Sequence, residues 1–537
     1  MTVARTVADV LADHVTFEVE CIDRMFMNVY QPRLQHVGGI VGYVHRHLGL
    51  PIVSTAPLAK ISDRFGRAVH SFAQTEGIPW VDVVKGQRKD DVMTEHLRHF
   101  TPAEGVVFIG RAQEKNTVFR TEKRRRPDGV AYPWIVKATG IINQFYFYCV
   151  DTDFGPFFLK FSSYFPYTGK LCINGHHWAQ RQAAKAGIGF TAMDNAFAAV
   201  NDPAALQGLC DRLGPAAIQA LLDKWLTILP NPFTDADLDA GYRYQLSILQ
   251  AEFSLTQMLD TPVTGRVFFE QVIRDNLDIG RPDQVSLIFD RRLRRTGRRH
   301  TPGRFRTRVI TEGVTPSLHV EYKHTTIKQY HKEGRALRTE TTINDTTDFE
   351  VRKGLVNLPA LREIGLRANR RLLGVQRLDH DPITGIRDLR TITDPVVTAT
   401  GTRVPGLRLG QQRSHALLTA LPIFRLQPDG FTNRDLRRLT AELRGLPSAA
   451  VTAGQMTYDL RRLRSHGLIR KIPHSQRYQI TEHGLTTAMF LTRVHDRLLP
   501  TGLAELADQD PPRPLRVAAN AYQAAFEKLT TTARFAA

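Results

Sequence analysis

The sequence predicts a multidomain protein of mixed α/β and α+β class. Its 537 residues, 60.6 kDa, are several times the length of one ordinary domain, about 150 residues. Residues 1–112 alternate strand-like and helix-like segments, which is typical of βαβ units on a mostly parallel sheet. Residues 318–343 instead hold three closely spaced strand-like segments, which indicate antiparallel strands in the centre of the chain.

Composition restricts the classes of protein to consider. Hydrophobic residues make up 42% and charged residues 23% of the chain, so disordered, collagen-like and disulfide-stapled classes are excluded. No run of about 18 apolar residues could span a membrane, and the N-terminal segment is unlike a secretory signal. We therefore expect a cytoplasmic protein with no membrane partner. The four cysteines lack the spacing of zinc or redox pairs, so no zinc is expected: Cys21, Cys149, Cys172 and Cys210.

The first domain, residues 1–112, is expected to be an α/β domain with a βαβ-type sheet. Alternation of apolar and polar side chains and short apolar runs beside glycine indicate its strands, and helical spacing of apolar positions indicates its helices. The predicted strands are residues 15–22, 79–84 and 106–110, and the predicted helices are residues 39–48 and 61–75.

Residues 113–200 form an aromatic-rich region in which a β-hairpin is predicted. Four consecutive aromatic residues at 145–148 precede the sequence DTDFG at 151–155, and an apolar run follows at 157–161. Aspartate and glycine are typical turn residues between two such strands.

The next region, residues 201–280, is predicted to be helical. Thr234 and Asp237 form an approximate capping box, and Leu246, Leu249 and Phe253 keep helical spacing.

Four further segments follow. Residues 281–380 combine an Arg-rich loop, an antiparallel meander and a helix at 358–373. A linker rich in Pro, Gly and Thr is expected at 381–410, a compact unit at 411–500 and a helical tail at 501–537.

The charge of the chain favours a polyanionic partner. The net charge is +19 and the pI is near 9.9, which makes nucleic acid the first expectation. Residues 291–308 hold nine Arg and no acid, and residues 411–500 carry a net charge of +8. The first segment is predicted to be a mobile loop that orders on a phosphate backbone; a solvated loop without a partner is the alternative. Its candidate contacts are Arg291, Arg292, Arg294, Arg295, Arg298 and Arg299.

Residues 411–500 show a clear order of elements. A helix at 414–421 is followed by a helix that begins at the capping box of Thr432 and Asp435, and by a third helix at 453–466. Gly467 ends the third helix, a hairpin joins 469–472 to 477–480, and a last helix begins after Thr481. In the third helix, Met456, Leu460 and Leu463 are expected to face inward, and Arg461, Arg462 and Arg464 outward.

This order, with the segment YDLRRLRSHGLIRKIPHSQRYQIT, resembles the winged-helix DNA-binding domain over residues 411–496. The resemblance implies that the third helix enters the major groove, while the hairpin, or wing, touches the backbone or the minor groove. It assigns base or phosphate contacts to Arg461, Arg462 and Arg464, and backbone contacts to Arg470, Lys471 and Arg477. A module that binds only protein is the alternative.

Three groups of residues could carry metal-dependent cleavage of phosphodiesters. In the first, Asp151 and Asp153 would hold Mg²⁺ or Mn²⁺ at a strand end, with Lys160 on the phosphate and His176 and His177 nearby. The same composition also fits a simple hairpin turn.

The second group resembles the PD-(D/E)xK nuclease motif. Pro282 and Asp283 precede a predicted strand at 284–289, and Glu321 and Lys323 lie on a later strand. The resemblance implies that the acids bind metal and that the lysine orients the attacking water; chance occurrence of so short a motif is the alternative.

The third group centres on Glu340, on a strand rich in threonine. It would become a metal ligand if another strand brought Asp151 or Asp23 near, as in RNase H-like sheets. A cross-strand ion pair with Lys328 or Arg338 is the ordinary alternative.

The sequence thus predicts a cytoplasmic nucleic-acid-binding protein, most simply one that binds duplex DNA through a winged helix. A metal-dependent nuclease, or a replication or recombination protein of a mobile element, is a further expectation. The competing classes are a non-catalytic regulator or replication initiator, and an RNA-binding protein that uses the Arg-rich loop. We expect no nucleotide cofactor, because no phosphate-loop signature is present, and the oligomeric state is left open.

Overall fold

The computed structural model describes residues 5–84, 89–260, 265–277, 279, 281–291, 301, 303–310, 316–378, 382–426, 429–500, 503 and 521. It divides into two compact units, Met1–His380 (unit 1) and Asp381–Ala537 (unit 2). The mixed α/β class is confirmed, because helices surround a large mixed sheet in unit 1. No helix among these residues has the length and apolarity that crossing a bilayer requires.

Within the described part of unit 1, one sheet joins eleven strands in the order β11-β12-β13-β14-β10-β2-β7-β6-β5-β4-β3. In chain order these strands are β2 (Val15–Tyr30), β3 (Trp80–Asp82), β4 (Gly105–Arg125), β5 (Ala131–Asp151), β6 (Gly155–Ser162), β7 (Gly169–Asn174), β10 (Gln245–Leu259), β11 (Arg304–Ile310), β12 (Ser317–Lys323), β13 (Thr325–Lys332) and β14 (Ala336–Ile343). Two small pairs stand apart from this sheet: β1 (Arg5–Thr6) with β15 (Arg377–Leu378), and β8 (Phe190–Met193) with β9 (Ala196–Val200).

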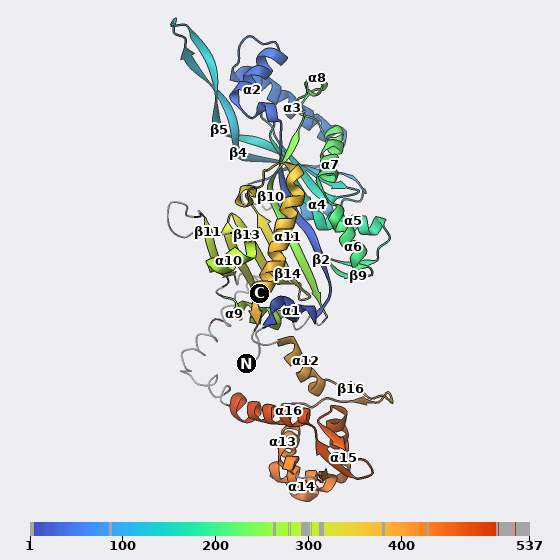
Figure 1. Ribbon diagram of the computed structural model, residues 1–537. Coiled ribbons are helices and arrows are strands. Elements are labelled where there is room, and N and C mark those ends of the chain that lie inside the picture. The colour runs from blue at the N-terminus through green and yellow to red at the C-terminus, as the bar shows by residue number, and fades with distance from the viewer. Residues whose placement is uncertain are drawn as a thin grey trace. The chain divides into compact units, whose positions relative to one another are not determined.

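The helices of unit 1 pack around this sheet (Figure 1). They are α1 (Val7–Ala12), α2 (Val37–Gly42), α3 (Thr55–Thr75), α4 (Lys89–Leu97), α5 (Gly175–Lys185), α6 (Pro203–Arg212), α7 (Pro215–Ile228), α8 (Asp235–Asp239), α9 (Gly265–Asp275), α10 (Pro282–Phe289) and α11 (Leu358–Val375). The predicted helix at 358–373, the aromatic hairpin and the central meander are all confirmed.

The predicted mostly parallel N-terminal sheet is wrong. Among the described strands, only β3 and β4, with α4 between them in the chain, pair in parallel. The other neighbouring pairs of the large sheet are antiparallel, and β2 lies between β10 and β7. An alternating strand pattern predicts one buried face but does not encode which strand lies beside it.

The predicted helical region 201–280 is wrong over residues 245–259. Helices α6 and α7 precede this segment, but the segment itself is β10, which pairs with β2 and β14 in the middle of the sheet. From Phe253 to Leu259 every residue is buried, because both faces of the strand are covered. A strand buried on both faces lacks the alternation that distinguishes it from a helix.

The strand predicted at 284–289 is also wrong, since this segment belongs to helix α10. Pro282 stands in its first turn, and the buried Val285, Ile288 and Phe289 have the three- and four-residue spacing of one helix face.

Two helices cover opposite faces of the sheet at its centre. Phe253 of β10 contacts α11, where a Cβ added to Gly365 would lie 2.3 Å from the Phe253 ring. Asn369 of α11 donates to the Phe253 carbonyl at 2.9 Å and accepts from Thr341 of β14 at 2.6 Å. The next residue, Ser254, points to the other face and contacts His176 of α5. The strands β2, β10 and β14 are therefore held between α11 and α5.

Unit 2 contains α12 (Pro382–Thr393), β16 (Val396–Val397), β17 (Arg403–Val404), α13 (Gln412–Ala420), β18 (Phe431–Thr432), α14 (Asn433–Leu443), α15 (Ala453–Ser465), β19 (Ile469–Lys471), β20 (Arg477–Ile480) and α16 (Glu482–Arg493). The predicted linker at 381–410 therefore carries a helix and a two-stranded hairpin. The capping box of Thr432 and Asp435 is confirmed, and β18, β20 and β19 form a three-stranded sheet. The tail predicted at 501–537 lies almost entirely outside the described residues.

Candidate functional site

Asp151 is a buried turn residue at the end of β5. Its Oδ1 accepts from the backbone N–H of Asp153 and Phe154, at 2.8 and 3.1 Å, and its Oδ2 accepts from Lys224 at 2.8 Å and from the Trp225 indole at 2.9 Å. Burial alone raises the pKa of this carboxyl, but the Lys224 and Trp225 donors outweigh burial and leave the pKa below its ordinary value. Protein donors thus occupy both oxygens, and Asp151 closes the β5–β6 turn.

The other members of the first group have separate partners. Asp153 accepts from Lys185 at 2.6 Å and Gln182 at 2.9 Å, which lower its pKa. Lys160 pairs with Glu114 at 2.6 Å and lies over the Tyr146 ring. His176 and His177 lie in the first turn of α5, not on a strand. The contacts of this group are those of a hairpin turn and its ion pairs.

The second group is divided between a helix and a strand. Asp283 is in the first turn of α10, whereas Glu321 and Lys323 are on β12. Glu321 is 5% exposed and forms ion pairs with Arg306, at 2.8 Å, and with Arg308. Lys323 donates to the backbone carbonyl of Asp348 at 3.4 Å. Asp283 therefore lies on a helix where the motif requires a strand, and two arginines already pair with Glu321.

The third group does bring two predicted acids together. Arg338 of β14 is fully buried and donates to Glu340 of the same strand at 2.7 Å and to Asp23 of β2 at 2.5 Å. It also donates to the Asn195 carbonyl at 2.5 Å, and Tyr330 of β13 donates to Glu340 at 2.8 Å. Burial lowers the pKa of the Arg338 guanidinium, but the charges of Asp23 and Glu340 outweigh burial and raise it. Glu340 thus forms the expected ion pair with Arg338, but within β14, and the cross-strand ion pair of Arg338 is with Asp23.

His176 completes this network. Its Nε2 lies 2.9 Å from Arg338 Nη2 and 3.0 Å from Ser254 Oγ. Because arginine can only donate, Nε2 must be the acceptor, which places the imidazole proton on Nδ1. Burial, followed by the positive charge of Arg338, holds the pKa of His176 well below its ordinary value. His176 is therefore a neutral acceptor for a buried arginine.

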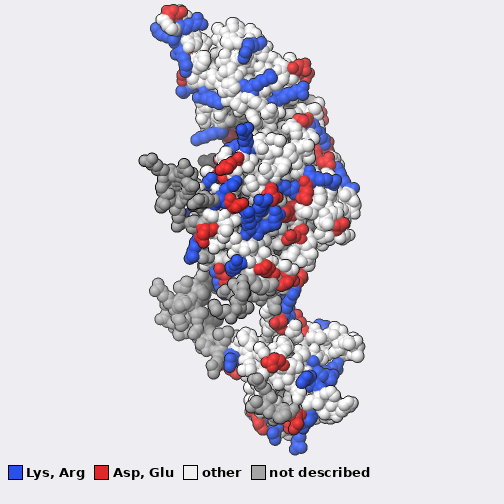
Figure 2. Space-filling model, in the orientation of Figure 1, with Lys and Arg blue, Asp and Glu red and all other residues white. Residues whose placement is uncertain are grey.

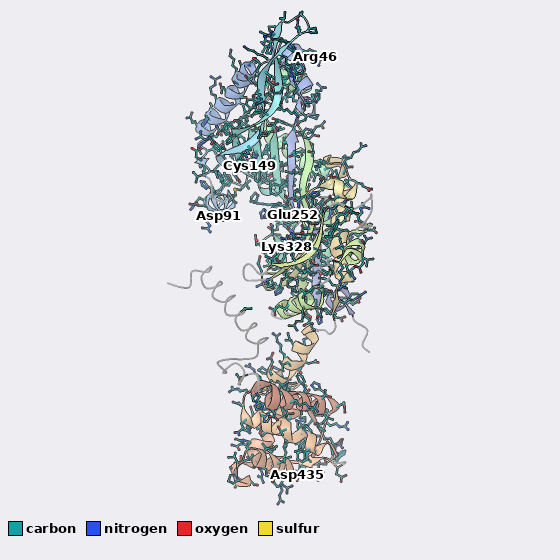
Figure 3. The ribbon with its side chains drawn as sticks, turned by 90° about the vertical axis from the view of Figure 1, so that its left-hand side faces the viewer. Arg46, Asp91, Cys149, Glu252, Lys328 and Asp435 are labelled. Carbon is teal, nitrogen blue, oxygen red and sulfur yellow. The ribbon has the colours of Figure 1, made fainter. Side chains whose placement is uncertain are left out.

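Glu252 is a third carboxylate on this face of the sheet. Glu340 of β14 lies opposite Ser254 of β10 and opposite Lys328 of β13, so these three side chains point to the same face of the sheet. Glu252 precedes Ser254 by two residues on β10 and therefore points to that face as well. Figure 3 labels Glu252 and Lys328. Burial, and then the negative charge of Asp23, raise the pKa of Glu252. The Gln250 side chain donates to Glu252 at 2.8 Å.

These acids do not converge as metal ligands. In the described part of the chain, one set of three potential ligands has its ligand atoms within 4.8 Å of one another: His415, His495 and Asp496 of unit 2. The Asp23, Glu252 and Glu340 group does not reach that spacing, nor do the first two groups. The contacts of Asp23, Glu340, Arg338 and His176 instead join β2, β14 and α5, which is a structural role.

The predicted Arg-rich loop lies mostly outside the described residues. This applies to Arg292, Arg294, Arg295, Arg298 and Arg299. Arg291 is described: it donates to the Phe349 carbonyl at 3.1 Å and lies over the Phe349 ring. Part of the predicted loop is in fact a strand, because Arg304, Arg306 and Arg308 belong to β11, an edge of the sheet.

In unit 2, the arginines of α15 have two different environments. Arg461 and Arg464 are exposed, as expected. Arg462 is 7% exposed, so its predicted outward orientation is wrong. The helix turns about 100° per residue, so Arg462, next to Arg461, points toward the neighbouring segment.

Arg462 is part of a buried network that orients α15. It donates to the carbonyl of Gly406 at 2.5 Å and lies 3.7 Å from Asp459, which pairs with Arg413 at 2.8 Å. Burial raises the pKa of Asp459, and its arginine partners only partly offset this. His466, just beyond α15, contacts the Thr391 carbonyl at 2.6 Å. Hydrogen bonds therefore join the segment predicted as a linker, residues 381–410, to Arg462 of α15 and to His466.

The residues of the predicted wing also differ from one another. Arg470 and Lys471 of β19 are exposed, and Arg470 donates to Gln479 across the hairpin at 3.1 Å. Arg477 donates to the carbonyls of Asp429, at 2.6 Å, and Gly430, at 2.7 Å. Arg477 thus stabilises the turn before β18.

One exposed side chain on α15 was missed by the sequence reasoning. Tyr458 is 45% exposed, three residues before Arg461 and therefore on the same face. Tyr458 is two residues from the inward Met456 and from the inward Leu460, about 200° around the helix from each, so the helical spacing of α15 could have predicted that it points outward. Comparisons with protein-family models, curated proteins and solved structures found no match to this chain.

Proposed function

We propose that this chain is a DNA-binding protein and that unit 2 acts as its winged helix. In this proposal α15 enters the major groove and the β19–β20 hairpin is the wing. The observation that carries the proposal is the exposed pair Arg461 and Arg464, three residues apart on α15. Such spacing presents both guanidinium groups on one face, where they can reach base edges or phosphates.

Rigidity of α15 supports the proposal. The helix begins at a capping box of Thr452 and Gln455, and Met456, Leu460 and Leu463 bury its inner face. The Asp459, Arg413 and Arg462 network fixes its rotation, so that Tyr458, Arg461 and Arg464 remain outside. A helix held in this way loses little conformational entropy when it binds a groove.

The hairpin supports a second set of contacts. Arg470 and Lys471 are exposed on β19, where they can bind phosphates beside the groove and set the register of α15. Arg462 and Arg477 are excluded from these contacts because backbone carbonyls hold their side chains.

The test is binding of the full-length protein to a labelled duplex at several salt concentrations. The double variant Arg461→Ser, Arg464→Ser should lose about tenfold in affinity and reduce the salt slope by roughly two, because each arginine is expected to neutralise one phosphate. The matched control is Arg403→Ser with Arg493→Ser, which removes two exposed cations of the same unit and should leave binding nearly unchanged. Wild-type affinity and slope in the α15 variant would refute the groove assignment.

The same samples also test the nuclease and RNA alternatives. Parallel reactions with Mg²⁺, Mn²⁺ or EDTA report cleavage, and competition with single-stranded DNA or RNA reports preference for the duplex. Binding without cleavage is the expected result, because protein donors hold Asp151, Glu321 and Asp23.

A further inference from the structure

The long hairpin of β4 and β5 has an outer segment that stands clear of the rest of unit 1 (Figure 1). The last contacts with the body are at Phe119, 4% exposed, Ile135, 1% exposed, and Thr121, whose Oγ1 accepts from Thr55 of α3 at 3.0 Å. Residues 122–134 lie beyond these contacts, and residues 123–131 are all exposed. We call residues 122–134 the ribbon tip.

The ribbon tip is long enough to enter a DNA groove. Four residues of β4 extend beyond Thr121, from Glu122 to Arg125, which corresponds to about 14 Å of strand. The major groove is about 8.5 Å deep and admits a two-stranded ribbon. Two backbone hydrogen bonds close the turn of the tip, because Arg126 N–H donates to the Val130 carbonyl at 3.0 Å and Gly129 N–H donates to the Arg126 carbonyl at 2.9 Å.

Four consecutive cations form one edge of the ribbon tip, and none of them forms an ion pair within the described part of the chain: Lys123, Arg124, Arg125 and Arg126. Figure 2 shows blue side chains gathered at this end of the molecule. The two acids of the tip have other partners, since Glu122 pairs with Arg120 at 3.4 Å and Asp128 accepts from Val130 N–H. Side chains alternate along a strand, so Lys123 and Arg125 face one side of the ribbon and Arg124 and Arg126 the other.

Aromatic rings hold the second pair of arginines in position. The guanidinium carbon of Arg124 lies 5.0 Å from the centre of the Trp134 ring, and that of Arg126 lies 5.7 Å from the centre of the Tyr132 ring. A guanidinium stacked on a ring keeps its N–H edges available for phosphate oxygens. The ribbon tip thus carries positive charge on both of its faces, and aromatic rings orient the arginines of one face. This distribution of charge matches a DNA groove, which has phosphates along both walls.

We propose that the ribbon tip is a second contact of this protein with duplex DNA, lying in a groove with its cations on the flanking phosphates. This inference rests on the proposed function, because it requires that duplex DNA is the partner. It assigns Lys123, Arg124, Arg125 and Arg126 to phosphate contacts and places Trp134 close to the DNA.

The test uses the full-length triple variant Arg124→Ser, Arg125→Ser, Arg126→Ser. Its duplex affinity should fall at least tenfold, and its salt slope should fall by two to three, while thermal unfolding stays unchanged. The control is Arg181→Ser, Arg212→Ser, Arg352→Ser, which removes the same charge from exposed positions on the body of unit 1 and should change affinity less than threefold. Tryptophan fluorescence should also change when wild-type protein binds duplex, and Trp134→Phe should abolish most of that change.

The two sets of variants distinguish failure of the ribbon contact from failure of the α15 assignment. Wild-type affinity and slope in the ribbon-tip variant, with a loss in the Arg461 and Arg464 variant, would overturn the ribbon contact and leave the function of unit 2 in place. A ribbon-tip variant that loses only single-stranded DNA or RNA binding would also overturn it. The reverse pattern would support the ribbon contact and reject the α15 assignment, and absence of duplex binding by the wild type would reject both.

Discussion

Arg338 of β14 donates to the Asp23 carboxylate of β2 at 2.5 Å, although 315 residues separate them in the sequence. The arginine is fully buried, and Glu340, His176 and the Asn195 carbonyl take its other donors. β10 lies between β14 and β2 in the sheet. The Arg338 side chain therefore reaches across β10 and connects β14 to β2, which comes first in the chain among the strands of this sheet.

Replacement of Arg338 by Met should destabilise unit 1 by about 3–5 kcal/mol, because Asp23 would remain buried without its cation. Urea denaturation followed by circular dichroism measures the loss. Adding Asp23→Asn should restore part of it, since the unpaired charge is removed. Arg367→Met is the control, because it breaks an exposed ion pair with Glu363 on α11 and should cost less than about 1 kcal/mol. A similar cost for both variants would contradict the structural role of Arg338.

Stability should fall as the pH drops below about 6.5, because His176 is neutral in the fold while its unfolded form takes up a proton. The folded pKa is depressed, by burial first and by Arg338 second, so the stabilising contribution is complete above the unfolded pKa and is lost as the pH falls through it. The limiting slope for one histidine is about 1.4 kcal/mol per pH unit. Denaturation between pH 8 and 5.5 should show a shallower slope for His176→Gln than for wild type. His99→Asn, at an exposed position, should keep the wild-type slope; equal slopes in all three proteins would be inconsistent with this assignment.

Asp151 and Asp153 should differ sharply in their effect on stability. Asp151→Ala leaves the Trp225 indole and two backbone N–H groups without their acceptor and leaves Lys224 with Glu104 as its remaining carboxylate partner, and we expect a loss of about 3 kcal/mol. Asp153→Ala removes an ion pair in which both side chains are about half exposed, for which about 0–1 kcal/mol is expected. Thermal and urea unfolding of the two variants measure the difference. If both acids were metal ligands instead, Mg²⁺ would stabilise wild type and neither variant.

Substitution of Arg462 should lower the stability of unit 2, whereas substitution of Arg461 should weaken duplex binding. Arg462→Ala removes bonds to the Pro405 and Gly406 carbonyls and leaves Asp459 with one close arginine, so unit 2 should lose about 2–3 kcal/mol. Arg461→Ala changes an exposed side chain and should leave unfolding within about 0.5 kcal/mol of wild type while weakening duplex binding several-fold. Unfolding curves and binding isotherms of the two single variants, recorded side by side, check both expectations. Loss of binding in Arg462→Ala without loss of stability would argue for a direct contact.

Much of the local structure could be predicted from the sequence because short-range chemistry determines it. The capping box of Thr432 and Asp435 begins α14, Asp151 and Gly155 close the β5–β6 turn, and alternating side chains mark the strands of the meander. The same reasoning failed at β10, where burial on both faces removes the alternation, and at α10, where a short apolar run was interpreted as a strand although Val285, Ile288 and Phe289 have helical spacing.

The sequence by itself determined the mixed class, the concentration of positive charge and the positions of several turns and caps. Only the tertiary structure decided which charged residues are available to a partner. Arg461 and Arg462 are neighbours with the same chemistry, yet one is exposed and the other bonds to backbone carbonyls 56 and 57 residues away. Likewise, nothing local in residues 123–126 showed that they lie at the end of a projecting hairpin, or that Asp23 and Arg338 would meet. Exposure and ion pairing depend on contacts between distant segments, and those contacts are set by how the whole chain packs.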